Sequence, residues 1–241
     1  MANTTIHETA VDERELVRTA RIAGLLYWGS IVCAVFGHFI IPAQIFDPAN
    51  AAATLTHLAE RETLARLGIV LDLGSATFQA LLALWFYRLF RSVDTFAAGS
   101  ITVLGTVNAA LVFAAAAFLG SALDVALDRS LGGAATAQLM YVVSGNFWKV
   151  VTVFFGLWLL PMGLLVLRSG WMPRPMGWLL IAGGVAYVLH AFIQYLAPGA
   201  GSISAVLVWL SVSEFWMAGY LVVKGVRRRP RADPVQEGLP A

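Results

Sequence analysis

The stretch AVLVWLSVSEFWMAGYLVVKG, residues 205–225, is apolar and long enough to cross a lipid bilayer, yet Glu214 lies near its middle. A spanning helix needs about 20 predominantly apolar residues. The whole chain shares this character, since 59% of its 241 residues are hydrophobic and only 12% are charged. Soluble domains carry about 25% charged residues. The composition therefore predicts an integral membrane protein whose first partner is the lipid bilayer.

Six stretches qualify as spanning helices and predict an all-α polytopic bundle with six transmembrane helices. They lie at residues 22–46, 64–87, 96–121, 137–167, 176–196 and 203–224. Helices are required because backbone groups that face lipid must be hydrogen-bonded within their own segment. We expect a cytoplasmic N-terminal segment (1–21), a transmembrane domain (22–226) and a disordered cytoplasmic tail (227–241). A short surface helix is also expected after Asp47 and Pro48, as a cap followed by a first-turn proline.

The basic residues predict the direction of the helices. Every second connection is rich in arginine or lysine, starting with the segment before residue 22, whereas the connections between carry few or none. Cytoplasmic loops are enriched in these residues, so both termini are expected in the cytoplasm. The first apolar run is too long for a cleavable signal peptide and is expected to remain as an anchor.

Several function classes leave no trace in the sequence. A basic stripe interleaved with aromatic residues is missing, which argues against nucleic-acid binding. The single cysteine, Cys33, cannot form an intrachain disulfide or a CxxC motif, and a buried packing role is expected for it. Zinc-hydrolase, P-loop and nucleophile-elbow motifs are also missing. No catalytic residue is predicted, and the sequence leaves the question of a cofactor open.

A few polar side chains interrupt the predicted helices and form the candidate ligand-binding set. An ionisable group costs roughly 2.5–3.5 kcal/mol at the centre of a membrane helix, so it normally faces the bundle interior. The set consists of His38, Asp72, Asn146, Lys149, His190 and Glu214. The predicted helix directions place these residues at middle and outer depths, which predicts an outward-facing polar pocket. The alternative is a polar clasp that only fixes helix packing.

Glu214 is expected to be held by an internal partner, and Lys149 is the predicted one. A lone buried carboxylate would sooner take up a proton than stay charged. An ammonium group within reach would allow both side chains to remain ionised. Asn146 lies three residues before Lys149 and shares its helical face.

A weak internal repeat suggests a second possibility for the histidines. His38 and His190 each lie late in an outward-running helix that begins with an arginine and a glycine, and each helix is followed by one that carries an acid, Asp72 or Glu214. Two histidines and two carboxylates that converge could bind a divalent metal. Two facing histidines could instead ligate a haem. Ordinary hydrogen bonds to the histidines remain the alternative.

The chain resembles a family of bacterial membrane proteins, domain-of-unknown-function family 4386. The resemblance lies in RTARIAGLLYW (18–28), AAATLTHLAERETLARLGIVLDL (51–73), VFFGLWLLPMGLLVLRSGWMPRPMGWLLIAGGVAYVLH (153–190) and SEFWMAGYLVVKGV (213–226). It covers nearly all of residues 18–226. The resemblance implies an all-helical protein of the bacterial cytoplasmic (inner) membrane and implies no activity. The family pattern matches Asp72 and Glu214, whereas SGNFWKVV (144–151), around Lys149, departs from it.

Three functions are compatible with these observations. The leading interpretation is a small-ligand or proton-coupled binding or transport module with an outward-facing polar pocket. The second is an accessory subunit that packs against a larger membrane-protein complex. The third is an intramembrane metal or haem enzyme. The identity of the ligand and the oligomeric state do not follow from the sequence.

Overall fold

The computed structural model describes residues 2–197 and 212–226, with side chains described from residue 13 onward. This part of the chain is helical and contains no strand, which confirms the predicted all-α class. The elements are α1 (Ala2–Ala34), η1 (Val35–Ile40), α2 (Pro42–Ile45), α3 (Ala51–Glu60), α4 (Glu62–Phe90), α5 (Thr95–Leu127), η2 (Arg129–Leu131), α6 (Ala134–Ser169), α7 (Arg174–Leu196) and α9 (Val212–Val223).

Five helical stretches of the described chain are long and apolar enough to cross a membrane. They are Glu13–Ile45, Glu62–Phe90, Thr95–Leu127, Ala134–Ser169 and Arg174–Leu196. Each overlaps one of the first five predicted spans. The last predicted span is described only in its second part, as the short apolar helix α9, and residues 203–211 and the predicted tail lie outside the described residues. The protein is a multi-pass helical membrane protein.

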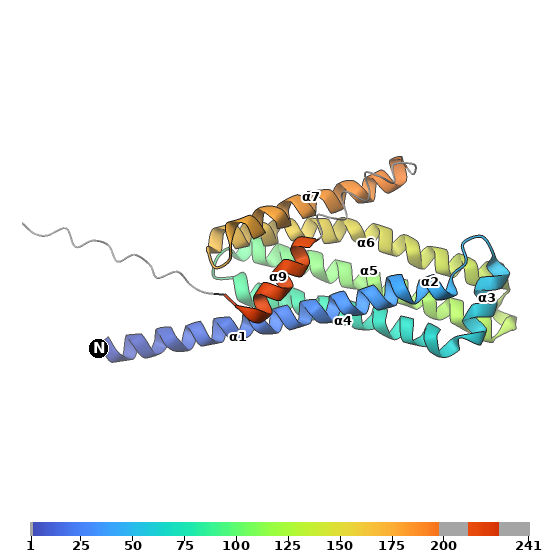
Figure 1. The fold of residues 1–241 in the computed structure, drawn as a ribbon, viewed down its shortest axis with the longest axis horizontal. Helices are drawn as coiled ribbons and strands as arrows, with labels where there is room; N and C mark the ends of the chain where they lie inside the picture. The colour runs from blue at the N-terminus through green and yellow to red at the C-terminus, as the bar shows by residue number, and fades with distance from the viewer. Residues whose placement is uncertain (1, 198–211, 227–241) are drawn as a thin grey trace, which may run out of the picture.

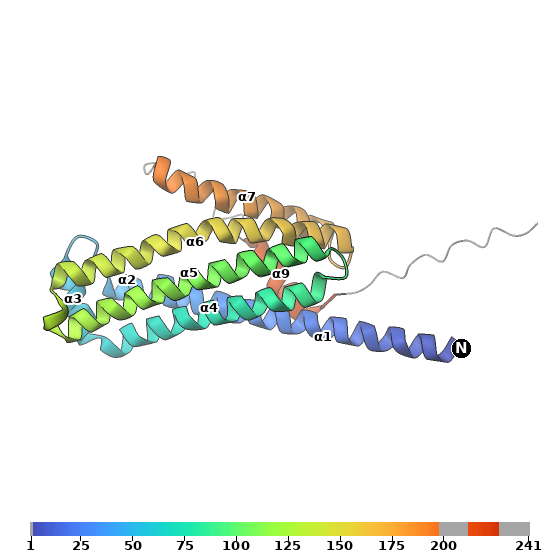
Figure 2. The same cartoon turned by 180° about the vertical axis from the view of Figure 1, so that it is seen from behind.

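The long helices lie side by side in chain order (Figure 1). α1 packs along α4, α4 along α5, α5 along α6, and α6 along α7, and the view from behind shows the same order (Figure 2). α9 crosses α1 and also contacts α7. α3 lies across the end of the bundle opposite the N-terminus (Figure 1). Sequence neighbours are therefore spatial neighbours, except that α9 returns to α1.

The predicted surface helix is present as α3, but its cap is different from the predicted one. Asn50 caps α3, because its side chain accepts a hydrogen bond from the Ala53 N–H at 3.0 Å. The Asp47 side chain instead accepts from the Ala49 N–H at 2.9 Å. Asp and Asn are both good caps, and the extended backbone of Asn50 makes it the cap here.

The opposite end of the bundle carries a set of basic and acidic side chains. Arg88 donates to Glu15 at 2.5 Å, so α4 is tied to α1. Asp94 caps α5 and binds Arg168 at the end of α6. The hydrogen bond from the Ala97 N–H, together with Arg168, holds the pKa of Asp94 below its usual value. The arginines that predict a cytoplasmic side thus lie at the end where α1 enters the bundle.

Two pairs of glycines bring α6 and α7 into close contact. Gly156 faces Gly184, and Gly163 faces Gly177. A Cβ atom on Gly156 would lie 2.5 Å from the Gly184 carbonyl oxygen, and one on Gly163 would lie 2.6 Å from the Gly177 carbonyl oxygen. Small residues at such positions allow the backbones of membrane helices to approach each other. The pairs also fix the antiparallel register of the two helices.

We expect Gly156→Ala to destabilise the protein by about 1–3 kcal/mol, because the added methyl group must displace backbone atoms of α7. Gly145→Ala is the matched control on the same helix, since a Cβ atom there meets nothing within 4 Å. Reversible unfolding in mixed detergent and dodecyl sulfate measures both. Equal stability of the two variants would contradict the close packing of α6 against α7.

Candidate functional site

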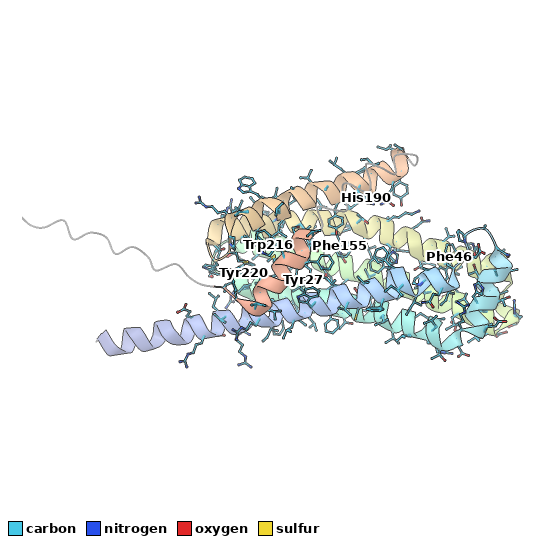
Figure 3. The ribbon with its side chains drawn as sticks, viewed as in Figure 1. Tyr27, Phe46, Phe155, His190, Trp216 and Tyr220 are labelled. Atoms are coloured by element: carbon cyan, nitrogen blue, oxygen red, sulfur yellow. The ribbon has the colours of Figure 1, made fainter. Side chains whose placement is uncertain are left out.

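Glu214 is buried where α9 meets α1 and α7. Its side chain is only 7% exposed, and its Oε2 atom accepts a hydrogen bond of 2.5 Å from the Tyr27 hydroxyl. Tyr187 of α7 also interacts with the carboxyl group. Figure 3 labels Tyr27 on α1, where α9 crosses it. Glu214 thus joins three helices that are far apart in the sequence.

The predicted pair of Glu214 with Lys149 is wrong. Lys149 is exposed on α6, and its Nζ atom donates to the Asn146 side chain at 3.2 Å. The ion pairs found in the described part of the chain do not include Lys149 or Glu214. The physical reason is the rotation of α6, because the neighbouring Trp148 takes the inward-facing position.

Asp72 of α4 is buried more deeply and is bound less well than Glu214. It is 0% exposed, and neither of its carboxyl oxygens has a hydrogen-bond partner among the described residues. The Trp148 side chain interacts with Asp72, but the contact falls short of a hydrogen bond, because the indole nitrogen is also without a partner. The predicted site residue His38 stacks on Trp148, with ring centroids 4.1 Å apart. Trp148 therefore lies against both Asp72 and His38.

The helix beside Asp72 is irregular. Residues Val35–Ile40 form a π-helical turn, η1, between α1 and α2. Within this turn Gly37 approaches Asp72 so closely that a Cβ atom would lie 2.8 Å from the Oδ1 atom. π-helical turns in longer helices are frequent at functional sites. The turn and the glycine together make room for the carboxyl group.

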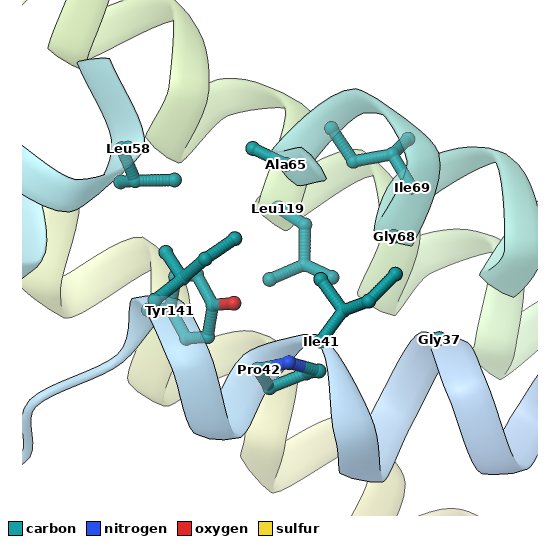
Figure 4. Close-up of a pocket in the computed structure, with 10 residues that line it drawn as sticks. Gly37, Ile41, Pro42, Leu58, Ala65, Gly68, Ile69, Leu119 and Tyr141 are labelled. Atoms are coloured by element: carbon teal, nitrogen blue, oxygen red, sulfur yellow. The ribbon is translucent and has the colours of Figure 1, made fainter. Parts of the chain in front are cut away.

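A narrow pocket leads from this region toward α3 (Figure 4). It is lined by Gly37, Ile41, Pro42, Ile45, Leu58, Ala65, Gly68, Ile69, Leu119 and Tyr141, and its volume of about 10 Å³ admits about one water molecule. Figure 4 shows the Tyr141 hydroxyl among the lining side chains. Tyr141 also interacts electrostatically with Asp72. The pocket is thus a mostly apolar passage with one hydroxyl group close to Asp72.

Buried polar side chains continue from Asp72 toward Glu214. Ser75 follows Asp72 by one helical turn, and its hydroxyl donates to the Ser30 carbonyl oxygen at 3.3 Å. The Ser30 hydroxyl lies 3.4 Å from the Gln79 Oε1 atom. Asn108 of α5 is 1% exposed, and both of its amide atoms lack partners within the described chain. Polar side chains therefore occur over several turns between the two carboxyl groups, among apolar residues such as Ala76 and Ala109.

Three of the six predicted residues lie on the α6–α7 side. The Gly156–Gly184 contact sets the register, so Lys149, seven residues before Gly156, is level with Ala191, seven residues after Gly184. Asn146 and Lys149 are thus at a similar depth to His190. His190 lies on α7 (Figure 3), and its Nδ1 atom is buried without a partner among the described residues. Among the described residues, no hydrogen bond or ion pair joins Asn146, Lys149 or His190 to Asp72 or Glu214.

The predicted convergence of two histidines and two carboxylates is wrong. Gly37 beside Asp72 and Tyr27 beside Glu214 are ten positions apart on continuous helix, which is about 15 Å in depth. Across residues 13–197 and 212–226 no group of three His, Cys, Asp or Glu side chains could hold a metal ion. The described residues thus offer no ligand set for the metal site that the repeat suggested.

The sequence interpretation missed the partners of the two acids. Tyr27, Tyr187, Trp148 and Tyr141 lie in apolar runs, where aromatic residues usually serve packing. A helical spacing could have identified part of the row: Asp72, Ser75 and Gln79 lie three and four residues apart on one face of α4. Tyr27 and Ser30 have the same spacing on α1.

We expect Tyr27→Phe to lower the free energy of unfolding by about 1–2 kcal/mol, because it removes a donor from a buried carboxyl group. A double-mutant cycle with Glu214→Gln, followed by unfolding in dodecyl sulfate, measures the coupling. Lys149→Met is the control and should change stability by less than about 0.5 kcal/mol, because its side chain is exposed. Coupling of Lys149→Met to Glu214→Gln would contradict the assignment of partners.

Comparison with known proteins gives a family and no activity. A family model described as Domain of unknown function (DUF4386) matches residues 22–225, which include most of the first candidate membrane helix, the other four, and α9. No curated protein and no solved structure matches the chain. The match extends over far more than half of the chain, and the protein belongs to the DUF4386 family.

Proposed function

We propose that this protein is a proton-coupled binding or transport module, in which Asp72 is the group that takes up the proton. One observation carries the proposal: Asp72 is 0% exposed, and its carboxyl oxygens have no hydrogen-bond partner among the described residues. A bare carboxylate in such surroundings is costly. A proton or a bound cation must therefore compensate it.

A proton suits this site better than a metal ion or a protein cation. No lysine or arginine forms an ion pair with Asp72 in the described part of the chain. The same residues contain no group of three potential metal ligands. The neighbouring pocket of about 10 Å³ has room for a water molecule and not for a larger ligand. Water is the carrier that could deliver a proton through such a passage.

The contrast between the two acids favours a proton-binding role over a purely structural clasp. Glu214 has the Tyr27 hydroxyl as a partner and joins α9 to α1, as a clasp would. Asp72 has the burial of a clasp residue without its hydrogen bonds. A carboxyl group that only fixed packing would be expected to have partners. Asp72 is therefore the better candidate for the residue that first takes up the proton.

The finer topology and the ligand contacts belong to the same proposal. We place both termini in the cytoplasm and count residues 203–224 as a sixth span of a bacterial inner-membrane protein, because the arginine-rich ends of α4, α6 and α7 lie at the end of the bundle where α1 enters. With this topology, Asp72 and the pocket beside α3 lie in the outer half of the bundle. Asn146, Lys149 and His190, also at outer depth, are the proposed contacts for a small ligand.

Infrared difference spectroscopy of the purified protein during a pH titration tests the assignment of Asp72. We expect a carbonyl-stretch band of a protonated carboxyl group that is lost in Asp72→Asn and kept in Glu60→Gln, a control at the exposed end of α3. The band should appear and disappear reversibly with pH. A spectrum that is unchanged in Asp72→Asn would refute proton uptake at this residue.

A further inference from the structure

The interior of the bundle contains an unusual number of buried polar atoms without partners. Among the described residues these include both Asp72 oxygens, the Gln79 Nε2 atom, both amide atoms of Asn108, and the Trp148 and Trp158 indole nitrogens. An unsatisfied buried polar atom is costly, so native proteins usually satisfy such atoms with internal water. The atoms named here come from α4, α5 and α6.

Helix register relates the polar side chains of α4 and α5 in depth. Ala83 of α4 packs against Gly105 of α5, where a Cβ atom would lie 2.8 Å from the Ala83 Cβ atom. Gln79 is four residues from Ala83, and Asn108 is three residues from Gly105 in the antiparallel helix, so the two amides are at the same depth. The Ser30 hydroxyl contacts Gln79 at 3.4 Å and links α1 to this level.

The row of polar side chains ends at Glu214. The Trp158 ring lies 3.5 Å from the Cβ position of Gly105 and packs edge-on against Tyr27, with ring centroids 5.7 Å apart. Tyr27 in turn donates to Glu214. On the cytoplasmic side of Tyr27 the interior is mostly apolar, with Thr19 also buried there, and is filled by Phe86, Leu89, Phe90, Met217, Leu221 and their neighbours. The polar row therefore runs from Asp72 to Glu214 and stops there.

We infer that this row is a water-filled proton path that delivers protons from Asp72 to Glu214, and the inference rests on the proposed proton uptake at Asp72. The proton leaves the Asp72 carboxyl group for a neighbouring water. Water and the Ser30 and Ser75 hydroxyls pass it on, each accepting one proton and releasing another. The amides of Gln79 and Asn108 hold the water in place. At the end of the row the Tyr27 hydroxyl gives its proton to Glu214 and takes one from water, so the charge moves and no atom is lost.

Other titratable side chains adjoin the two ends of the path. Near Asp72 these are His38 of η1, which stacks on Trp148, and Tyr141 of α6; Cys33 of α1 lies one helical turn away, against Gly74. Near Glu214 they are Tyr27 and Tyr187. Within the described chain, no lysine or arginine forms an ion pair with either carboxyl group. The path therefore joins two acids without a fixed positive charge between them.

Time-resolved infrared spectroscopy of the full chain after a rapid pH drop tests the path. The carbonyl bands of Asp72 and Glu214 are first assigned by their loss in Asp72→Asn and Glu214→Gln. We expect the Asp72 band to rise first in the wild type. Asn108→Leu and Gln79→Leu should slow the Glu214 band roughly tenfold or more and leave the Asp72 band unchanged.

Two controls separate a blocked path from a damaged fold. Thr106→Val alters an exposed hydroxyl on the same helix as Asn108 and should leave both rates unchanged. Asn108→Ser keeps a group that can bind water and should restore the rate of the Glu214 band. An unchanged Glu214 rate in both leucine variants would overturn the path while uptake at Asp72 stands. If no band is lost in Asp72→Asn, both the path and the proposed proton uptake at Asp72 are overturned.

Discussion

The arrangement of this bundle depends on how a carboxyl group is accommodated inside a membrane. The hydrogen bond from Tyr27 to Glu214 is the polar interaction that helps join the last described helix, α9, to the first, α1, beside apolar contacts such as Trp28 with Phe215. Hydrophobic burial gives little preference among partners in lipid, because acyl chains are as apolar as leucine side chains. A buried acid with one matching hydroxyl can therefore specify which helices meet. The Gly156–Gly184 and Gly163–Gly177 contacts act in a similar way between α6 and α7, through shape rather than polarity.

Asp72, unlike Glu214, has no hydrogen-bond partner for its carboxyl oxygens among the described residues. It also lies in the bundle interior, and within the π-helical turn Gly37 is so close that a Cβ atom would lie 2.8 Å from its Oδ1 atom, so only a glycine leaves room for the carboxyl group. The free energy of a buried carboxyl group depends on its charge, so this environment favours reversible protonation over a fixed hydrogen bond. Depth separates the two acids by about 15 Å. The two acids would be the two ends of the proton path, and Ser30, Gln79 and Asn108 supply polar groups between them.

The sequence predicts the membrane helices well and the site only in part. Length and hydropathy are sufficient to find the five long spans, because lipid imposes both. The rule that acids in membrane helices face inward holds for Asp72 and Glu214, which are buried. The rule is wrong for Lys149, because Lys149 and Trp148 are adjacent and only the rotation of α6 decides which of them faces the interior. A helix that is apolar on all faces gives no signal for that rotation. The hydroxyls of Tyr27 and Tyr187 could not be assigned to Glu214 before the packing of α1, α7 and α9 was known.

An electron cryo-microscopy map of the full chain in a lipid nanodisc, with an antibody fragment bound to aid alignment, is the most direct test of this account. We expect Glu214 to lie against the Tyr27 hydroxyl. We also expect ordered water between Asp72 and the amides of Gln79 and Asn108, without a lysine or arginine beside either acid. A map in which the Asp72 carboxyl group faces acyl chains, or is paired with a basic side chain, would contradict the central claim that a buried, unpaired acid is maintained inside the bundle.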